Sequence, residues 1–266
     1  MRRLLLPLIL LGASLGAAPP RDIQRELLKI PTRPGVLQPA LLLTEGATPK
    51  AVALLFPGGS GKQSLLRRPI EVVLGPRGNF LVRSAEQLLT PDLAVLILDC
   101  PSDQAEGMND AFRISDEHAT DVQAVLALLR TRFKGVKLHL VGTSRGTVSA
   151  AYVAQELGPA VDGVVLSSSV FRASGNNLGL SLFRFERLKT PLLLVHHAED
   201  GCPTCPYGQA LKLADKVPLI TVRGGIEPES GPCDPLANHG FFGREVAVVQ
   251  AIRNWILGLP YERDIP

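Results

Sequence analysis

The sequence lacks the features that would place it in several large classes of protein. Its N-terminal apolar run, residues 4–11, is much shorter than the roughly 20 residues that a membrane-spanning helix needs. An excess of one charge is also missing, because 28 Lys and Arg residues face 25 Asp and Glu residues. No basic stripe with interleaved aromatic residues indicates a nucleic-acid partner. A hydrophobic content of 45% without internal repeats excludes disordered, collagen-like and multi-span membrane proteins.

The N-terminus has the arrangement of a secretory signal peptide over residues 1–18. Two arginines precede the apolar run 4–11, and Gly16 and Ala18 fit the −3 and −1 positions of a cleavage site. We therefore expect residues 19–266 to form the mature protein as a single domain. This protein would be periplasmic or secreted, with no stable membrane insertion after cleavage.

Short apolar runs alternate with amphipathic stretches along the rest of the chain. The runs are typical of strands buried on both faces, and the stretches between them have helical spacing. This alternation predicts an α/β fold with a mostly parallel, doubly wound central sheet and helices on both faces. The expected strands are 51–56, 93–98, 137–141, 161–166, 191–195 and 217–222, with an earlier edge strand at 36–43, and the expected helices are 116–132, 147–157, 208–213 and 245–257.

One pentapeptide carries a specific chemical hypothesis. Residues 142–146 read Gly-Thr-Ser-Arg-Gly, which fits the pattern G-x-S-x-G, and they lie directly between an expected strand and an expected helix. A serine on such a tight turn is exposed above the sheet, where the N-terminus of the helix favours negative charge. Ser144 is therefore the candidate nucleophile.

A serine nucleophile needs a base, and the base needs an orienting carboxylate. His239 is the candidate base, because it stands beside a glycine just before the last expected helix, on a loop that could reach the serine. Asp200, which follows the expected strand 191–195, is the candidate acid. The chain order Ser144, Asp200, His239 is the order found in α/β-hydrolases. Asp99 is a rival acid, but its place one element before the serine fits this topology poorly.

A glycine-rich segment follows the expected strand 51–56 and is the candidate oxyanion loop. Its sequence, Pro-Gly-Gly-Ser-Gly-Lys at 57–62, lets backbone N–H groups face a developing negative charge without an intervening side chain. The expected donors are the N–H groups of Gly59 and Arg145. The segment does not fit the phosphate-binding pattern G-x-x-x-x-G-K-[ST], which argues against a nucleotide-hydrolysing enzyme.

These motifs resemble those of the α/β-hydrolase fold family, and in particular its small, exported bacterial serine hydrolases of unassigned substrate. The matching segments are FPGG at 56–59, GTSRG at 142–146, HHAEDGC at 196–202 and NHG at 238–240. The resemblance implies Ser144 as nucleophile, Asp200 as acid and His239 as base, with no cofactor and no metal.

The expected activity is hydrolysis of a carboxylic ester or related acyl bond in a small-molecule substrate, through an acyl-enzyme. An amidase or peptidase, a thioesterase or an acyltransferase would use the same three residues, and a non-catalytic binding protein could share the scaffold. The short interval between the expected strands 161–166 and 191–195 leaves no room for a large lid, which argues against long-chain lipids. Sequence alone does not fix the oligomeric state.

Several other residues have less definite interpretations. His118 lies within the expected helix 116–132 and is expected at its surface or cap. Arg145, beside the candidate nucleophile, would suit an anionic substrate together with three arginines of the loop 57–79, although a solvated basic loop fits them equally well. These three are Arg67, Arg68 and Arg77.

Four cysteines in an exported chain suggest disulfides. If the candidate acid and base are hydrogen-bonded, their loops must meet, and Cys202 and Cys233 lie on those two loops. We therefore predict a Cys202–Cys233 disulfide, with Cys202–Cys205 and Cys205–Cys233 as the alternatives. Cys100 would be a free buried thiol or a partner of Cys205. A zinc site built from cysteines alone usually shows two C-x-x-C pairs, and this chain has one.

Overall fold

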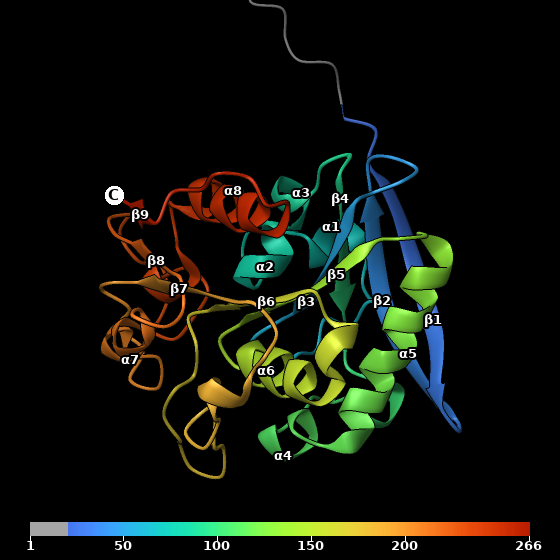
Figure 1. Ribbon diagram of the computed structural model, residues 1–266, viewed down its shortest axis with the longest axis horizontal. Coiled ribbons are helices and arrows are strands. Elements are labelled where there is room, and N and C mark those ends of the chain that lie inside the picture. Colours follow the sequence, from blue (N-terminus) through green and yellow to red (C-terminus); the bar gives the residue numbers. More distant parts are fainter. Residues whose placement is uncertain (1–20) are drawn as a thin grey trace, which may run out of the picture.

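The computed structural model describes residues 21–266, so the predicted signal peptide at 1–18 lies outside it (Figure 1). A 9-stranded sheet crosses the molecule in the order β1-β2-β4-β3-β5-β6-β7-β8-β9. The strands are β1 (Gln24–Arg33), β2 (Val36–Thr44), β3 (Ala51–Phe56), β4 (Leu93–Leu98), β5 (Lys137–Thr143), β6 (Gly163–Ser167), β7 (Leu192–His197), β8 (Leu219–Val222) and β9 (Asp264–Ile265).

Helices fill most of the connections between these strands. The α-helices are α1 (Ile70–Val73), α2 (Phe80–Arg83), α3 (Ala85–Leu88), α4 (Asp110–Arg113), α5 (Asp116–Arg132), α6 (Gly146–Leu157), α7 (Tyr207–Leu213) and α8 (Glu245–Ile256). Single 3-10 turns are η1 (Ser102–Gln104), η2 (Gly158–Ala160), η3 (Phe185–Arg187) and η4 (Asn238–Gly240).

The sheet is mostly parallel, as predicted. Strands β4, β3, β5, β6, β7, β8 and β9 pair in parallel, whereas β1 and β2 form a hairpin and β2 runs antiparallel to β4. The prediction of an edge strand at 36–43 is wrong in position, because β2 has a partner on each side and β1 is the edge. Polar residues interrupt the apolar ones along β1, and only Ile30 is buried, so this strand has no compact apolar run to reveal it.

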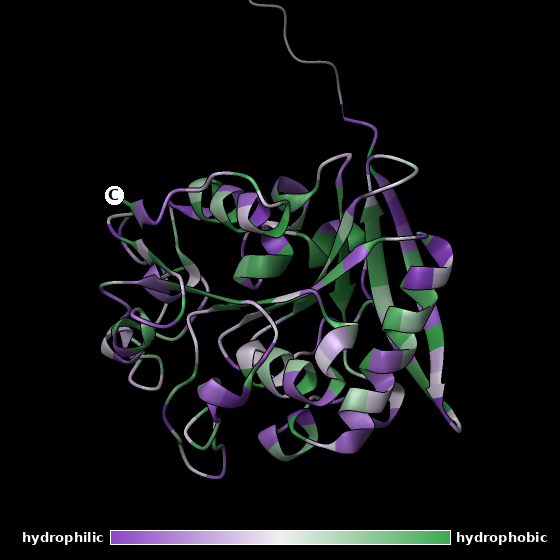
Figure 2. Ribbon diagram, viewed as in Figure 1, coloured by the Kyte–Doolittle hydropathy of each residue, from purple (hydrophilic) through white to green (hydrophobic). Residues whose placement is uncertain are grey.

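Alternate residues of the central strands feed two separate apolar layers, as expected for strands buried on both faces. In β3, Val52, Leu54 and Phe56 join the layer that includes residues of α5 and α6. Their neighbours Ala51, Ala53 and Leu55 join the layer that includes residues of α2, α3 and α8. The two groups of helices lie on opposite sides of the sheet in Figure 1, and Figure 2 shows apolar residues concentrated along the strands between them.

Helix α5 has the predicted bounds, because its ends are encoded locally. The Ser115 side chain accepts a hydrogen bond from the N–H of His118 at the N-terminus, and two acidic residues follow in the first turn. The expectation that His118 is exposed or capping is wrong for its side chain, which is 2% exposed. Its ring packs against Phe56 and Phe112, so tertiary contacts decided the burial of this side chain.

The connection between β6 and β7 contains only the 3-10 turn η3 among its helical elements, in agreement with the prediction of no large lid. The carboxyl ends of the parallel strands, where the candidate site lies, are therefore not covered by a helical subdomain of residues 21–266. Among residues 21–266, no helix combines the length and the apolar character needed to cross a bilayer.

Candidate active site

Ser144 occupies the turn between β5 and α6 in a strained backbone conformation. Its φ of 50° lies in the left-handed region, which is uncommon for a residue with a side chain. The turn is held from both sides: the Ser144 N–H donates to the carbonyl of Ser167 at 3.0 Å, and the Thr147 hydroxyl donates to the Ser144 carbonyl at 2.6 Å. These contacts fix the serine at the carboxyl end of the central strand β5.

The glycine at the end of the pentapeptide is required by close packing. A Cβ atom on Gly146 would lie 1.9 Å from the carbonyl oxygen of Phe56, at the end of β3. Only glycine lets the helix α6 start this close to the neighbouring strand. The pattern G-x-S-x-G thus brings the serine turn against the segment after β3, which is the candidate oxyanion loop.

The candidate oxyanion loop lies directly beside Ser144. A Cβ atom on Gly58 would lie 2.9 Å from the Cβ of Ser144, and Gly59 has a positive φ of 60°. Within residues 21–266, neither Gly59 nor Arg145 uses its backbone N–H in a hydrogen bond with another protein group. Both N–H groups are therefore available to a bound oxygen atom, as a donor pair for an oxyanion must be.

The contacts of the Arg145 side chain do not support the expectation that it binds an anionic substrate. Its guanidinium forms a salt bridge with Asp110 at 2.6 Å and donates a second hydrogen bond to Asn177 at 2.8 Å. The Asp110 carboxylate also accepts the N–H of Gly179, which ties the segment after β6 to α4. The positive charge of Arg145 is thus neutralised by a buried partner.

Asp200 and His239 form a buried hydrogen-bonded pair. The two side chains are 0% and 5% exposed, and the distance from His239 Nδ1 to Asp200 Oδ2 is 2.9 Å. The other carboxylate oxygen of Asp200 accepts the N–H of Cys202 at 2.9 Å, which fixes the orientation of the acid. A carboxylate on Nδ1 leaves Nε2 as the ring nitrogen that can accept a proton.

The environment of His239 acts on its pKa in two directions. Burial by itself lowers the pKa of His239, but the hydrogen bond to Asp200 outweighs burial and raises that pKa above its ordinary value. The Nε2 atom of His239 is buried and forms no hydrogen bond with any described residue. Hydrogen bonds between base and nucleophile are often long before a substrate binds.

A single cavity of about 810 Å³ brings the candidate residues together. Ser144 and His239 both line it, with Gly58 and Gly59 of the candidate oxyanion loop. The structure thus hydrogen-bonds Asp200 to His239 and places His239 in one cavity with Ser144, without a hydrogen bond between these last two residues. Of the loop arginines, Arg68 and Arg77 line this cavity, whereas Arg67 does not.

Further contacts, besides the Asp200–His239 hydrogen bond, join the loop that carries Asp200 to the loop that carries His239. The predicted disulfide between Cys202 and Cys233 is present, with a Cα–Cα distance of 4.6 Å. The amide of Asn238 donates to the Glu199 carbonyl at 3.1 Å. Cys100 and Cys205 are both free and buried.

Ser168 is a contributor that the sequence did not reveal. Its hydroxyl donates to the backbone carbonyl of His239 at 2.7 Å, and its own φ of 45° is positive. It holds the loop of the base against the end of β6. The run of three serines at 167–169 is the only feature of the sequence near this contact, and it does not show which hydroxyl reaches the loop that carries His239.

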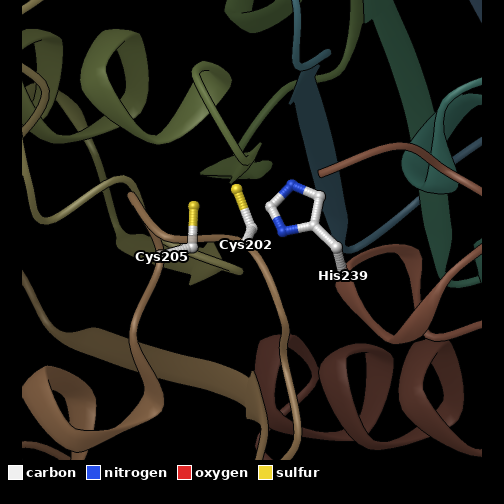
Figure 3. Close-up of side chains that lie close together, drawn as sticks. All are labelled: Cys202, Cys205 and His239. Atoms are coloured by element: carbon white, nitrogen blue, oxygen red, sulfur yellow. The ribbon is translucent and has the colours of Figure 1, made fainter. Parts of the chain in front are cut away.

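Cys202, Cys205 and His239 each offer one metal-ligand atom, and these atoms lie within 4.8 Å of one another (Figure 3). The Cys202 sulfur is already bonded to Cys233, so Cys205 and His239 alone keep a free donor. Zinc sites use three or four protein ligands. The cluster is a thiol beside a disulfide and an imidazole, and its ligands do not fit a metal centre while the disulfide is intact.

The rival acid Asp99 has a different partner set. One carboxylate oxygen accepts the N–H groups of Gln63 and Cys100 at 2.7 and 2.8 Å, and the other accepts the N–H of Leu65 at 2.7 Å. These bonds fasten the loop 57–69 to the end of β4. The Asp99 carboxylate has no hydrogen bond to a histidine among the described residues.

No protein-family model and no curated protein matches this sequence. Solved structures do match. Dienelactone hydrolase from Anabaena variabilis is 16% identical with a TM-score of 0.61, over 90% of this chain and 99% of that chain. A serine hydrolase without a lid from Xanthomonas campestris is 15% identical with a TM-score of 0.56, over 92% and 100% of the two chains.

A third similar structure is Est1E from Butyrivibrio proteoclasticus, which has also been solved with ferulic acid bound. It is 14% identical with a TM-score of 0.56, over 87% of this chain and 98% of that chain. At this level of identity the similarity establishes the fold.

Proposed function

This chain has the α/β-hydrolase fold, and from that premise we propose that it is a serine hydrolase that cleaves carboxylic esters. The observation that carries the proposal is the Asp200–His239 hydrogen bond of 2.9 Å at the wall of the cavity that Ser144 also lines. A buried carboxylate on Nδ1 of a histidine serves to hold one tautomer, with Nε2 free to act as a base.

In the proposed mechanism, Ser144 attacks the carbonyl carbon of the ester while His239 Nε2 takes the hydroxyl proton. Asp200 holds the tautomer of the ring and stabilises the imidazolium that forms. The N–H groups of Gly59 and Arg145 donate to the oxyanion of the tetrahedral intermediate. The proton then passes from His239 to the leaving alcohol, and water releases the acyl group from Ser144 by the same steps in reverse.

The residues that line the cavity suit a short or medium-sized, partly polar substrate. Its wall combines charged side chains, among them Arg68, Glu71 and Asp234, with apolar ones such as Val72 and Phe80. Long acyl chains usually need a deep apolar channel or a lid, and no helical lid formed by residues 21–266 covers the site. An ester of an aromatic or hydroxylated acid, of the kind exemplified by the ferulic acid bound to Est1E, fits this lining better than a lipid.

A fluorophosphonate probe tests the proposal directly. We expect the wild-type protein to be labelled at Ser144, as peptide mapping would show, and to hydrolyse short-chain p-nitrophenyl esters. Ser144→Ala should lose both labelling and turnover, by on the order of a million-fold in kcat. Ser149→Ala is the matched control, since Ser149 lies on α6, the helix that follows Ser144, and is fully buried outside the cavity. Labelling of Ser144→Ala equal to that of the wild type would contradict the assignment.

We further propose that the protein acts outside the cytoplasm, after removal of residues 1–18. The sequence pattern of the N-terminus and the Cys202–Cys233 disulfide support this location. N-terminal sequencing of the protein recovered from the periplasm or the medium should find a start at Pro19. Recovery of the intact chain from the cytoplasm alone would contradict export.

A further inference from the structure

Arg113 is a buried cation directly behind the candidate oxyanion loop. It ends the short helix α4 and is 1% exposed. One arm of its guanidinium, Nη1, donates to the hydroxyl of Ser149 on α6 at 2.9 Å. The other arm, Nη2, donates to the carbonyl oxygen of Gly59 at 3.0 Å.

No carboxylate among the described residues forms a salt bridge with this guanidinium. The nearby acid Asp110 is already paired with Arg145 at 2.6 Å. Burial lowers the pKa of Arg113 to about 10, which still leaves the side chain charged at neutral pH. Burying a cation without a carboxylate partner is costly, so its position calls for a role beyond packing.

The two loop residues beside the Arg113 guanidinium, Gly59 and Gly61, have no side chains of their own to fix them. Gly59 and Gly61 have positive φ values of 60° and 82°, and the Gly61 N–H donates to the Gly58 carbonyl at 3.1 Å. A Cβ atom on Gly61 would lie 3.1 Å from Nη2 of Arg113. The guanidinium thus fills the space under the loop and holds the peptide that follows Gly59.

We propose that Arg113 is a positioning residue that fixes the oxyanion loop for transition-state binding, an inference that rests on the proposed hydrolase function. Its hydrogen bond restrains the Gly59–Ser60 peptide and with it the ψ angle of Gly59, so that the adjoining Gly58–Gly59 peptide, which carries the candidate donor N–H, keeps its place beside Ser144. Its positive charge, behind the loop, also favours the negative charge that develops on the substrate oxygen in a site of low dielectric.

The test compares three variants in steady-state hydrolysis of a p-nitrophenyl ester. Arg113→Met removes the charge and both hydrogen bonds while keeping much of the volume. We expect kcat to fall by about 10- to 100-fold, somewhat less than the loss of a direct oxyanion donor, with KM within about threefold of the wild type. Ser149→Ala removes the other hydrogen bond of the same guanidinium and should leave kcat within about twofold.

Inhibition by a boronic acid separates positioning from a general loss of structure. A boronate bound to Ser144 carries a tetrahedral anion in the oxyanion site, so its Ki should rise in Arg113→Met by a factor similar to the fall in kcat. A folding defect would reduce the active fraction, which fluorophosphonate titration measures, without changing this Ki. A kcat and a boronate Ki equal to those of the wild type would overturn the inference.

Arg113→Lys covers the case in which Arg113→Met does not fold. A lysine keeps the charge but cannot donate to Ser149 and Gly59 in the fixed fork geometry of a guanidinium. We expect a kcat between those of the wild type and Arg113→Met, and an unchanged kcat would overturn the inference. The proposed function is tested separately. If the wild-type protein is neither labelled nor active, the hydrolase assignment is wrong. If the wild type is labelled and the Arg113 variants are fully active, only the proposed role of Arg113 is wrong.

Discussion

At the scale of single residues, two aspartates with buried carboxylates each follow a strand of the sheet, β4 and β7, and have different partners. Asp200 is hydrogen-bonded to His239, whereas Asp99 accepts backbone N–H groups of the loop that begins at Gln63. A carboxylate that orients an imidazole acts on the chemistry. A carboxylate that accepts only backbone N–H groups acts on the shape of a loop.

Substitution of these two residues should therefore have separable effects. We expect Asp200→Asn to lower kcat by roughly ten-thousand-fold with little change in Tm, because the amide favours the wrong tautomer of His239. Asp99→Asn keeps one acceptor oxygen but loses charge-assisted bonds to the loop, so it should lower Tm and reduce kcat far less. Thermal melts and steady-state kinetics on both proteins check this. A larger loss of kcat in Asp99→Asn would show that the acid was wrongly assigned.

At the scale of elements, the site depends on two loops that meet although they are distant in the chain. The loop after β7 carries Asp200 and Cys202, and the loop before α8 carries Cys233 and His239. A disulfide and a hydrogen bond between side chains join them. We therefore expect the disulfide to stabilise the fold and the geometry of the candidate site together.

Loss of this disulfide should lower stability and activity in parallel. The bond closes a loop between residues 31 positions apart, which is worth about 3–4 kcal/mol in the chain-entropy model. We expect Cys233→Ser to lose a free energy of unfolding of that order and to show a reduced kcat, because the loop of His239 is less restrained. Urea unfolding and kinetics measure the two effects.

The control for this prediction is chemical reduction. A reductant should destabilise the wild-type protein but have no further effect on the double variant Cys202→Ser/Cys233→Ser, since its remaining cysteines, Cys100 and Cys205, are free thiols in the wild type as well. A reductant that destabilises both proteins equally would point to another cause. Full activity of the reduced wild type would show that the hydrogen bond alone holds the two loops.

At the scale of the whole molecule, buried histidines contribute to the pH dependence of stability. Burial lowers the pKa of His118 to about 3 and the pKa values of His139 and His196 to about 4. The unfolded chain binds protons at these sites below its ordinary pKa of about 6.5, so their contribution to stability is lost as the pH falls from there. The pKa of His239 is shifted in the opposite direction, so its contribution to stability is present below its ordinary pKa and is lost as the pH rises through its raised pKa.

We therefore expect Tm to fall on acidification below about pH 6.5, and His118→Phe to reduce the fall. At pH 5 the shift of His118 corresponds to about 2 kcal/mol of lost stability, from a pKa of about 3 against 6.5. The phenylalanine ring should pack among Phe56 and Phe112 without needing partners for two ring nitrogens, both of which are unpaired in the structure.

Differential scanning calorimetry of both proteins at pH 5 and pH 7.5 measures this effect. The difference in stability between His118→Phe and the wild type should be larger at pH 5. An equal difference at the two values would mean that His118 does not titrate in this range. Lys29→Gln, at an exposed position, should differ from the wild type in stability by the same amount at pH 5 and pH 7.5.

The sequence by itself determined those parts of the protein that are encoded locally. Compact apolar runs predicted the central strands because buried parallel strands must be apolar on both faces, and Ser115 predicted the start of α5 because a cap is a contact between near neighbours. The pattern around Ser144 was readable because Gly146 must let β3 approach closely. The order of Ser144, Asp200 and His239 then predicts the three candidate residues of the site.

Only the tertiary structure decided the features that depend on contacts between distant segments. Strand β1 is held by its pairing with β2 and not by an apolar run of its own, and His118 is buried by rings from β3 and α4. The roles of Ser168 and Arg113 likewise depend on carbonyl groups of His239 and Gly59, which lie 71 and 54 positions away in the chain. A backbone carbonyl has no sequence signature, so the partner of such a side chain becomes known only when the folded chain places the two together.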